Sequence, residues 1–422
     1  MTSGNMQLRI RITALFALFI SLFSFAQQPL IGSLLDYKMR GESMLILKTD
    51  FSVGANTIRV NSLFDVRNTD FIDDELKQDL YGNLKTSNRA GGHSYFGGSY
   101  SWTRDSIASE NSNFFTVGYQ YTAIYSARFS DNLGYGILYG NKDFAGLNVD
   151  MGPTNVFRID YSKLSLGHTW RVDKQTLHIS WSVLLGHRLQ HGRASTFEMY
   201  TEPNGDYIDL NVKGRGYLSD TAQTGTFAIS GGGVGLDMFY ALENTEGHTW
   251  SFGMYDMGVI LWDKNSLHGK REGVFRYEGF YVENIFDLND SVWANSSDSI
   301  VDSFVNVKQG VMLRPTPPLF LANYSHNISN GLLRAVDFGV NYRMYNSNIP
   351  LVYAMARLNP IGKSELSPYM SFGGYNRFGV GVDYLLSANG FDFHLNIGNL
   401  QTLLTAGNGY GVNAGFRILY HW

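Results

Sequence analysis

The sequence Tyr410-Gly411-Val412-Asn413-Ala414-Gly415-Phe416-Arg417-Ile418-Leu419-Tyr420-His421-Trp422 alternates between apolar and polar or small residues almost to its last position. Successive side chains of a β-strand point to opposite faces, so the apolar members share one face and the polar members the other. Leu419 is the exception to the alternation. A long strand with one apolar and one polar face is typical of the wall of a transmembrane β-barrel, in which lipid contacts the apolar face.

The same alternation recurs in upstream runs at 115–129, 177–185, 234–240, 336–344, 378–384 and 391–397. Soluble sandwiches also alternate, but their strands are typically about 5–6 residues long, whereas a transmembrane strand needs about 9–11. Aromatic residues stand near several run ends, as Trp250 and Trp262 do, where the interfacial girdles of a barrel lie. The sequence therefore predicts an all-β fold, a transmembrane antiparallel β-barrel of about 14 strands within a range of about 12–16.

Composition supports this fold class and excludes several functions. Only 17% of residues are charged, while Gly (46), Phe (28) and Tyr (26) are abundant; soluble domains average about 25% charged residues. The formal net charge is −4, and no basic stripe runs along the chain, so no nucleic-acid partner is expected. Without cysteine, neither disulfides nor Cys-ligated metals can form.

The first residues have the features of an export signal. Arg9 and Arg11 precede an apolar run from Ile12 to Phe25, and Ser24-Phe25-Ala26 offers small residues to a signal peptidase. We predict a signal peptide over 1–26, cleaved between Ala26 and Gln27, and hence export to the cell outer membrane. No later apolar run has the length of about 20 residues that a membrane-spanning helix needs.

Two regions fit the barrel pattern poorly. In the N-terminal segment 27–92, residues 42–51 and 57–64 could pair as strands, and acidic residues from Asp70 to Glu75 start a helix that continues through Leu80. This helix is expected either on a surface loop or as a plug or hatch inside the lumen. The barrel itself is expected over 93–422, with a long polar loop at 264–314 on the extracellular side.

The charged residues expected on the polar strand faces are candidates for lining the lumen: Arg128, Asp237, Arg343, Arg377, Asp383 and Arg417. They could line a path or bind a ligand, or they could form an ion-pair network that fills the interior. The sequence predicts no catalytic, cofactor-binding or metal-binding residues. The glycines of Gly231–Gly235 lack the Lys-Ser/Thr of a phosphate-binding loop, and no nucleophile with a base is evident.

Four places in the chain carry a resemblance to a known family: Asn68–Ile72, Tyr277–Tyr281, Thr316–Tyr324, and Gly398–Leu400 together with Tyr410–Trp422. The chain resembles the uncharacterised (domain-of-unknown-function) outer-membrane β-barrels of Bacteroidota, which are similar to the long-chain fatty-acid transporter superfamily and its type IX secretion relatives. The Asn-Pro-Ala that those transporters place at their hatch is absent. The resemblance implies contact with outer-membrane lipid. It also implies that the barrel-assembly machinery recognises the final strand through Tyr420 and Trp422.

Two functions are therefore expected. The first is a conduit for hydrophobic or small amphipathic solutes. The alternative is a structural barrel, a scaffold that partners secretion, motility or surface-assembly machinery. An enzyme is not expected, because the sequence offers no catalytic constellation.

Overall fold

A computed structural model describes residues 41–422 except 70, 104–111, 221, 223–224, 279–305, 329–330, 345–346 and 360–363. The predicted signal peptide and its cleavage site at Ala26 and Gln27 lie outside the described residues. Within the described ranges, no helix is both long and apolar enough to cross a membrane.

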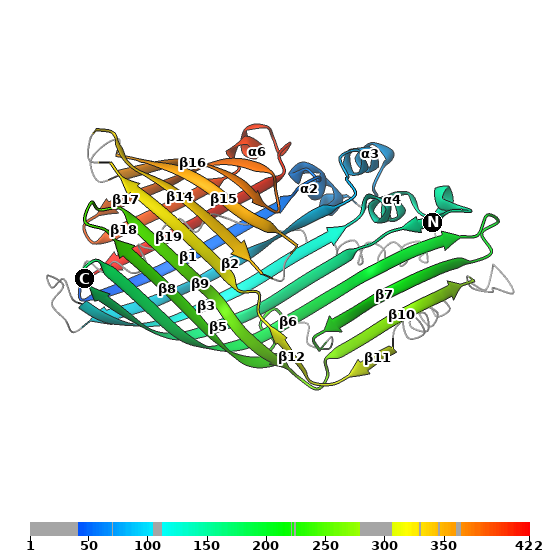
Figure 1. Ribbon diagram of the computed structural model, residues 1–422, viewed down its shortest axis with the longest axis horizontal. Coiled ribbons are helices and arrows are strands. Elements are labelled where there is room, and N and C mark those ends of the chain that lie inside the picture. The colour runs from blue at the N-terminus through cyan, green and yellow to red at the C-terminus, as the bar shows by residue number, and fades with distance from the viewer. Residues whose placement is uncertain are drawn as a thin grey trace.

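Fourteen antiparallel strands close into a barrel, as the alternation predicts (Figure 1). They are β1 (Ser43–Ala55), β2 (Asn88–Thr103), β3 (Ser112–Phe129), β5 (Thr154–Val172), β6 (Gln175–Thr201), β8 (Gly231–Glu243), β9 (Thr249–Trp262), β13 (Leu319–Asn327), β14 (Leu333–Arg343), β15 (Ile349–Leu358), β16 (Ser364–Gly374), β17 (Phe378–Ala388), β18 (Phe391–Gly398) and β19 (Gly411–His421). Each of the seven alternating runs lies within one of these strands, apart from Met344, Tyr410 and Trp422, each of which stands one residue beyond a strand end.

The barrel closes where the last strand meets the first. β19 pairs with β1 from Gly411 opposite Gly54 to His421 opposite Met44. Backbone hydrogen bonds continue the seam to Trp422, whose N–H and C=O both bond to Ser43. The Trp422 ring stacks on Tyr420 and Tyr100. The predicted N-terminal segment 27–92 therefore contains a wall strand, β1, and its barrel boundary at 93 is wrong.

The two ends of the barrel differ in their connections. At the end where the chain finishes, turns are as short as Asp173-Lys174 and Asn389-Gly390. At the other end the connections carry helices α2 (Val60–Asn68), α3 (Asp74–Gly82), α4 (Asp131–Tyr139) and α6 (Leu400–Leu404), the 3-10 turn η2 (Lys142–Phe144) and strands β4 (Asn148–Asp150), β7 (Ile208–Leu218), β10 (Leu267–Tyr277), β11 (Asn306–Gln309) and β12 (Met312–Pro315). Outer-membrane barrels have short periplasmic turns and long extracellular loops. This rule assigns the elaborated end to the cell exterior.

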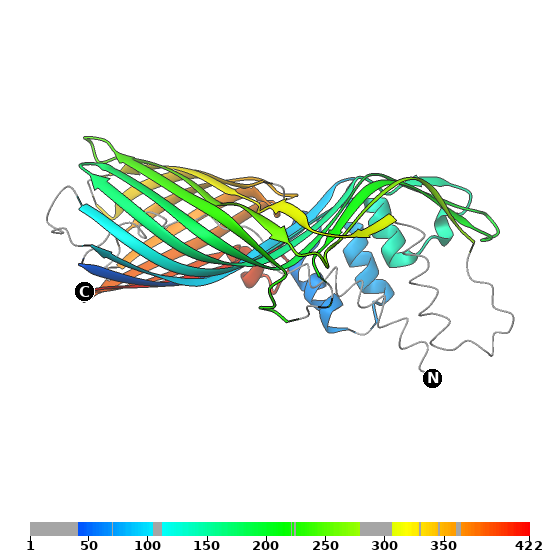
Figure 2. The same ribbon diagram turned by 90° about the horizontal axis from the view of Figure 1, so that it is seen from below.

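Several strands continue beyond the barrel and form a curved sheet that we call the extension. β6 pairs with β8 up to Gly186 and with β7 from Gln190 onward, and β10 adds to the free edge of β7. Figure 2 shows this sheet projecting from the barrel, with the helices on one side of it. The expected loop at 264–314 is thus strand over Leu267–Tyr277, because the β6–β7 hairpin offers an edge for pairing.

Helix α3 forms as its sequence predicts: the Asp73 side chain accepts a hydrogen bond from the Leu76 N–H, and Asp74 and Glu75 occupy the first turn. Its buried Leu80 packs with Leu63 of α2 in an apolar cluster that also contains Ala90 of β2 and Phe129 of β3. Both helices lie against the extension, outside the barrel. The plug alternative is therefore wrong for this helix. Its apolar side chains pack against the outer face of the sheet.

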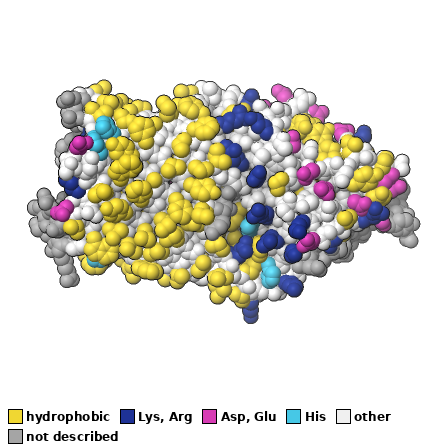
Figure 3. Space-filling model, viewed as in Figure 1, with side chains coloured by type: hydrophobic (Ala, Val, Ile, Leu, Met, Phe, Trp, Pro, Cys, Tyr) yellow, Lys and Arg dark blue, Asp and Glu magenta, His cyan; other side chains and the backbone are white. Residues whose placement is uncertain are grey.

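On the face seen in Figure 3, a wide hydrophobic belt covers the barrel. Its members are large apolar side chains that remain exposed on the outer faces of the strands, among them Phe96, Leu166, Trp181, Val234 and Phe372. Exposed apolar residues of this kind face lipid in a transmembrane barrel.

Candidate functional site in the barrel lumen

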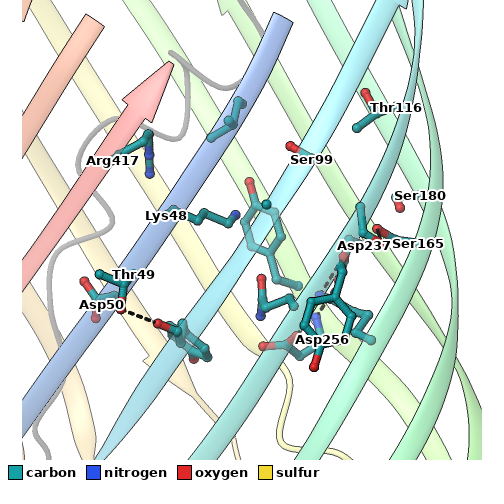
Figure 4. A pocket seen from close by; sticks show the side chains of 18 of the residues that line it. Lys48, Thr49, Asp50, Ser99, Thr116, Ser165, Ser180, Asp237, Asp256 and Arg417 are labelled. Atoms are coloured by element: carbon teal, nitrogen blue, oxygen red, sulfur yellow. Dashed lines mark hydrogen bonds and ion pairs between the residues drawn. The ribbon is translucent and has the colours of Figure 1, made fainter. Parts of the chain in front are cut away.

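The inner faces of the strands line a cavity of about 180 Å³ inside the barrel. Its lining includes the apolar residues Ile46, Leu319 and Phe416 and many polar residues, with both signs of charge: Lys48, Asp50, Tyr95, Ser99, Gln120, Lys163, His178, Asp237, Asp256, Arg343, His394, Asn396 and Arg417. Figure 4 shows Asp237 and Asp256 together on one side of the cavity, with Lys48, Asp50 and Arg417 on the other. The mixture suits a small solute with polar or charged groups of either sign.

A charged cluster of four residues borders this cavity. Lys163 of β5 donates hydrogen bonds to Asp237 of β8 and to Asp256 of β9, each with an Nζ–Oδ distance of 2.8 Å. A guanidinium nitrogen of Arg343 lies 3.1 Å from the second carboxylate oxygen of Asp256. All four side chains are nearly inaccessible to water. Two cations and two carboxylates neutralise each other, which buried charges require.

Arg343 also bridges the lumen from one wall to the other. Its guanidinium contacts the hydroxyl of Tyr95 on β2. In the circular strand order, β14 is the seventh strand from β2 in both directions, so the two strands face each other across the barrel. The Arg343–Tyr95 contact therefore divides the lumen.

Local irregularities of the sheet bring the acidic residues of the cluster together. The pairing of β8 with β9 shifts register between Leu236 and Met238, and Asp256 has a left-handed backbone with φ 58°. The Asp256 N–H donates to the carboxylate of Asp237 at 2.7 Å. The Thr316 hydroxyl donates to the Asp256 carbonyl, and Arg343 donates to the carbonyl of Pro317. Thr316 and Pro317, which lie between β12 and β13, thus hold the cluster in place.

Apolar layers lie on both sides of the polar cavity. Toward the exterior, inward-facing side chains from several strands pack into one buried cluster: Ile124, Phe157, Ile159, Tyr161, Leu184, Leu189, Ile260, Trp262 and Met312. Toward the periplasmic end, Met44, Ile46 and Leu419 form a smaller buried cluster. A solute moving along the barrel would meet apolar, charged and apolar surroundings in turn.

Connections at the exterior end fold inward over the mouth. Ser347, between β14 and β15, bonds through its N–H to Ser126 and through its hydroxyl to Asn155 on the opposite wall. Arg89 of β2 donates to the carbonyls of Gly374 and Asn376. Among the described residues, the mouth is therefore crossed by direct hydrogen bonds.

The six residues predicted to line the lumen lie in different parts of the structure. Asp237, Arg343 and Arg417 line the cavity. Asp383 is buried and bonds to His394, a lining residue, at 2.6 Å. Arg377 lies at the mouth, where it donates to the carbonyl of Asn56 at 2.6 Å.

Arg128 does not line the lumen, and its placement is a correction. It stands at the end of β3, where the strand has left the barrel, and it is exposed with its Nε 3.3 Å from the Ser87 hydroxyl. Alternation alone assigns it to the polar face correctly. It cannot show that the polar face of this strand emerges from the barrel before residue 128.

Sequence reasoning missed Lys163, Asp256 and Tyr95. Lys163 stands on the inner set of a long alternating strand, between Tyr161 and Ser165, and could have been found by extending the period-two pattern to 154–172. Asp256 interrupts the apolar run Thr249–Trp262, which is a signal for a buried charge. Tyr95 has no sequence signal, because its role depends on the opposite wall.

The fold defines a closed antiparallel β-barrel of the outer-membrane type. The chain belongs to the family of unknown function DUF5723, whose model matches residues 42–398. No curated protein matches the chain.

Three solved structures illustrate its likeness to other barrels. The TodX deltaS2S3 mutant monoaromatic hydrocarbon channel is 9% identical over 94% of each chain, with a TM-score of 0.43. The Ralstonia pickettii toluene transporter TbuX is 11% identical over 91% of this chain and 90% of its own, with a TM-score of 0.40. A mutant Rh. blastica porin is 7% identical over 90% and 99%, with a TM-score of 0.26. Likenesses this distant carry no inference about a solute.

Proposed function

We propose that this protein is a gated conduit for small amphipathic solutes across the outer membrane. The observation that carries the proposal is the mixed-charge cavity of about 180 Å³ inside the barrel. The Arg343–Tyr95 contact beside it serves as the gate, because it spans the lumen without a covalent or backbone link.

The order of layers along the lumen favours amphipathic over purely hydrophobic solutes. The cavity has charged groups on both sides, and an apolar molecule would have to displace their hydration without replacing their hydrogen bonds. A solute with an apolar body and a polar or zwitterionic head can match the apolar layers and the cavity in turn.

Uptake into proteoliposomes tests the conduit. Vesicles with the purified protein should swell in small zwitterionic solutes faster than empty vesicles, and a deletion strain should take up such solutes more slowly. A heat-denatured sample at the same protein-to-lipid ratio is the control. Equal swelling with native protein, denatured protein and no protein would contradict the proposed conduit.

The extension supports a second candidate, a scaffold that partners surface machinery. It is a folded platform outside the barrel, with α2, α3 and α4 packed on one side of its sheet. Affinity purification from solubilised envelopes, with the intact chain and with a chain lacking residues 208–218 and 267–277, tests this role. Recovery of the same proteins, or of none, with both chains would rule out the extension as the docking site.

The proposal also requires export. Density-gradient separation of envelopes should place the mature chain with outer-membrane markers, and its N-terminus should begin at Gln27. An intact N-terminus beginning at Met1 in the inner membrane would contradict the predicted signal peptide.

A further inference from the structure

A row of basic residues crosses the extension at right angles to its strands. Strand register places Arg128 of β3 opposite Asn155 of β5, and Asn155 opposite Arg193 of β6. Arg193 in turn lies opposite Arg215 of β7, which lies opposite Lys270 of β10. Directly opposed residues share a face of the sheet, so Arg128, Arg193, Arg215 and Lys270 form what we call the basic row. No stripe is visible along the sequence because each strand contributes at most one basic residue.

The row lies on the face of the extension that the helices leave uncovered. The neighbours Phe129 and Leu210 point the other way, into clusters that pack against α4. All four basic side chains are exposed. This face is continuous with the inner face of the barrel wall, and it becomes accessible where the other wall strands end.

The charges of the row are largely uncompensated. Within the part of the chain that the structure describes, no carboxylate lies within ion-pair distance of Arg128, Arg193 or Arg215. Lys270 shares Glu272 with Lys213, at nitrogen–oxygen distances of 3.0 and 2.8 Å. Like charges on directly opposed strand positions repel and destabilise a sheet. An anion held between Arg193 and Arg215 would remove that repulsion.

Neighbouring groups add to the positive field. The Arg314 guanidinium lies 3.6 Å from the centre of the Tyr217 ring and donates to Nδ1 of His191 at 3.1 Å. Burial together with Arg314, Arg193 and Arg215 lowers the pKa of His191 to about 4. The imidazole therefore stays neutral at neutral pH and accepts the hydrogen bond of Arg314 without neutralising its charge.

The row borders the lipid-facing surface. Leu313 of β12, which precedes Arg314, and Leu261 on the paired strand are exposed on the outer face of the wall. Figure 3 shows Lys and Arg side chains gathered along the border of the hydrophobic belt, on the side of the extension. By the assignment of the barrel ends, this border is the level of the headgroups in the outer leaflet.

We propose that the basic row is a binding site for the phosphate groups of a phosphorylated lipid in the outer leaflet around the barrel. Guanidinium groups bind phosphate through paired, charge-assisted hydrogen bonds, and neighbouring strands about 4.8 Å apart place two of them on one phosphate. The acyl chains of the lipid would lie along the exposed leucines of β9 and β12. The site goes beyond the conduit, since it needs no solute in the lumen.

Native mass spectrometry of the full chain in a neutral detergent tests the site. The probes are lipid A with its phosphates, the same lipid after enzymatic removal of the phosphates, and inorganic phosphate. The test variant is Arg193→Gln with Arg215→Gln. The matched control is Lys85→Gln with Lys142→Gln, which removes two exposed charges from outside the row. Heat-modifiable migration on gels reports whether each variant is folded.

The proposal predicts that phosphorylated lipid A binds the wild type and the control equally. The row variant should bind it at least about tenfold more weakly, because it lacks two guanidinium groups that donate charge-assisted hydrogen bonds to phosphate. Removing the lipid phosphates should weaken binding to the wild type by a similar factor. This comparison tests phosphate recognition even if the row variant does not fold.

Equal binding of the phosphorylated and dephosphorylated lipid would overturn the proposal. So would full competition by inorganic phosphate at concentrations equal to those of the lipid, which would assign the row to a free anionic solute instead.

Discussion

The lumen wall and the uncovered face of the extension are the same face of one continuous sheet, yet their charged residues are arranged in opposite ways. In the lumen, Lys163 on β5 is buried between Asp237 and Asp256. Further along the same sheet, Arg193 and Arg215 stand side by side, exposed and without a carboxylate within ion-pair distance among the described residues.

Solvent explains the difference. A charge removed from water needs a partner, so the lumen contains a neutral cluster. An exposed charge is hydrated and screened, so a sheet tolerates repulsion that a buried site would not. A ligand therefore meets different conditions at the two places: the lumen cluster is paired internally and must be opened, whereas the basic row is already accessible to an anion.

The largest effect is expected from breaking the lumen cluster. Asp256→Asn leaves Lys163 and Arg343 with one carboxylate between them and should destabilise the barrel by about 3–5 kcal/mol. The exposed pair Arg276–Asp209 provides the control, since Asp209→Asn should change stability far less. Urea titration of the protein in lipid bilayers measures both, and equal effects would remove the contrast between buried and exposed charge.

A smaller effect is expected from reversing one charge in the basic row. Arg215→Glu turns two repulsive cross-strand pairs, with Arg193 and Lys270, into attractive ones, each worth roughly 0.2–1 kcal/mol. The extension should resist proteolysis longer, with Arg215→Gln intermediate, while binding of phosphorylated lipid is lost. Faster cleavage of the glutamate variant would show that the row is not under repulsion.

A third effect is expected from acid titration. The pKa of His191 is about 4 in the folded protein against an ordinary value of 6.5. Between these values the unfolded chain binds a proton that the folded chain does not, so stability falls as pH falls from about 6.5 to about 4. His191→Gln should flatten the pH dependence of protease resistance in this window, and an unchanged slope would assign it to other groups.

Sequence reasoning reached the barrel because alternation is local. Tyr410–Trp422 shows its two faces without reference to any other strand. The Arg343–Tyr95 contact and the Arg193–Arg215 pair could not be predicted, since both depend on which strands face or adjoin each other. The prediction that Arg128 lines the lumen is wrong for the same reason. Its face of the strand could be predicted, but the point where the strand leaves the barrel could not.

Single-channel recording in planar bilayers tests the gated conduit most directly. Tyr95→Ala removes the neutral half of the lumen-spanning contact and leaves Arg343 paired with Asp256, and Tyr95→Phe retains the ring as a volume control. We predict brief, low conductance for the wild type, somewhat longer openings for Tyr95→Phe, which loses the hydroxyl but keeps the ring beside Arg343, and the largest, longest openings for Tyr95→Ala. Folded Tyr95→Ala protein with no more conductance than wild type would contradict the gate.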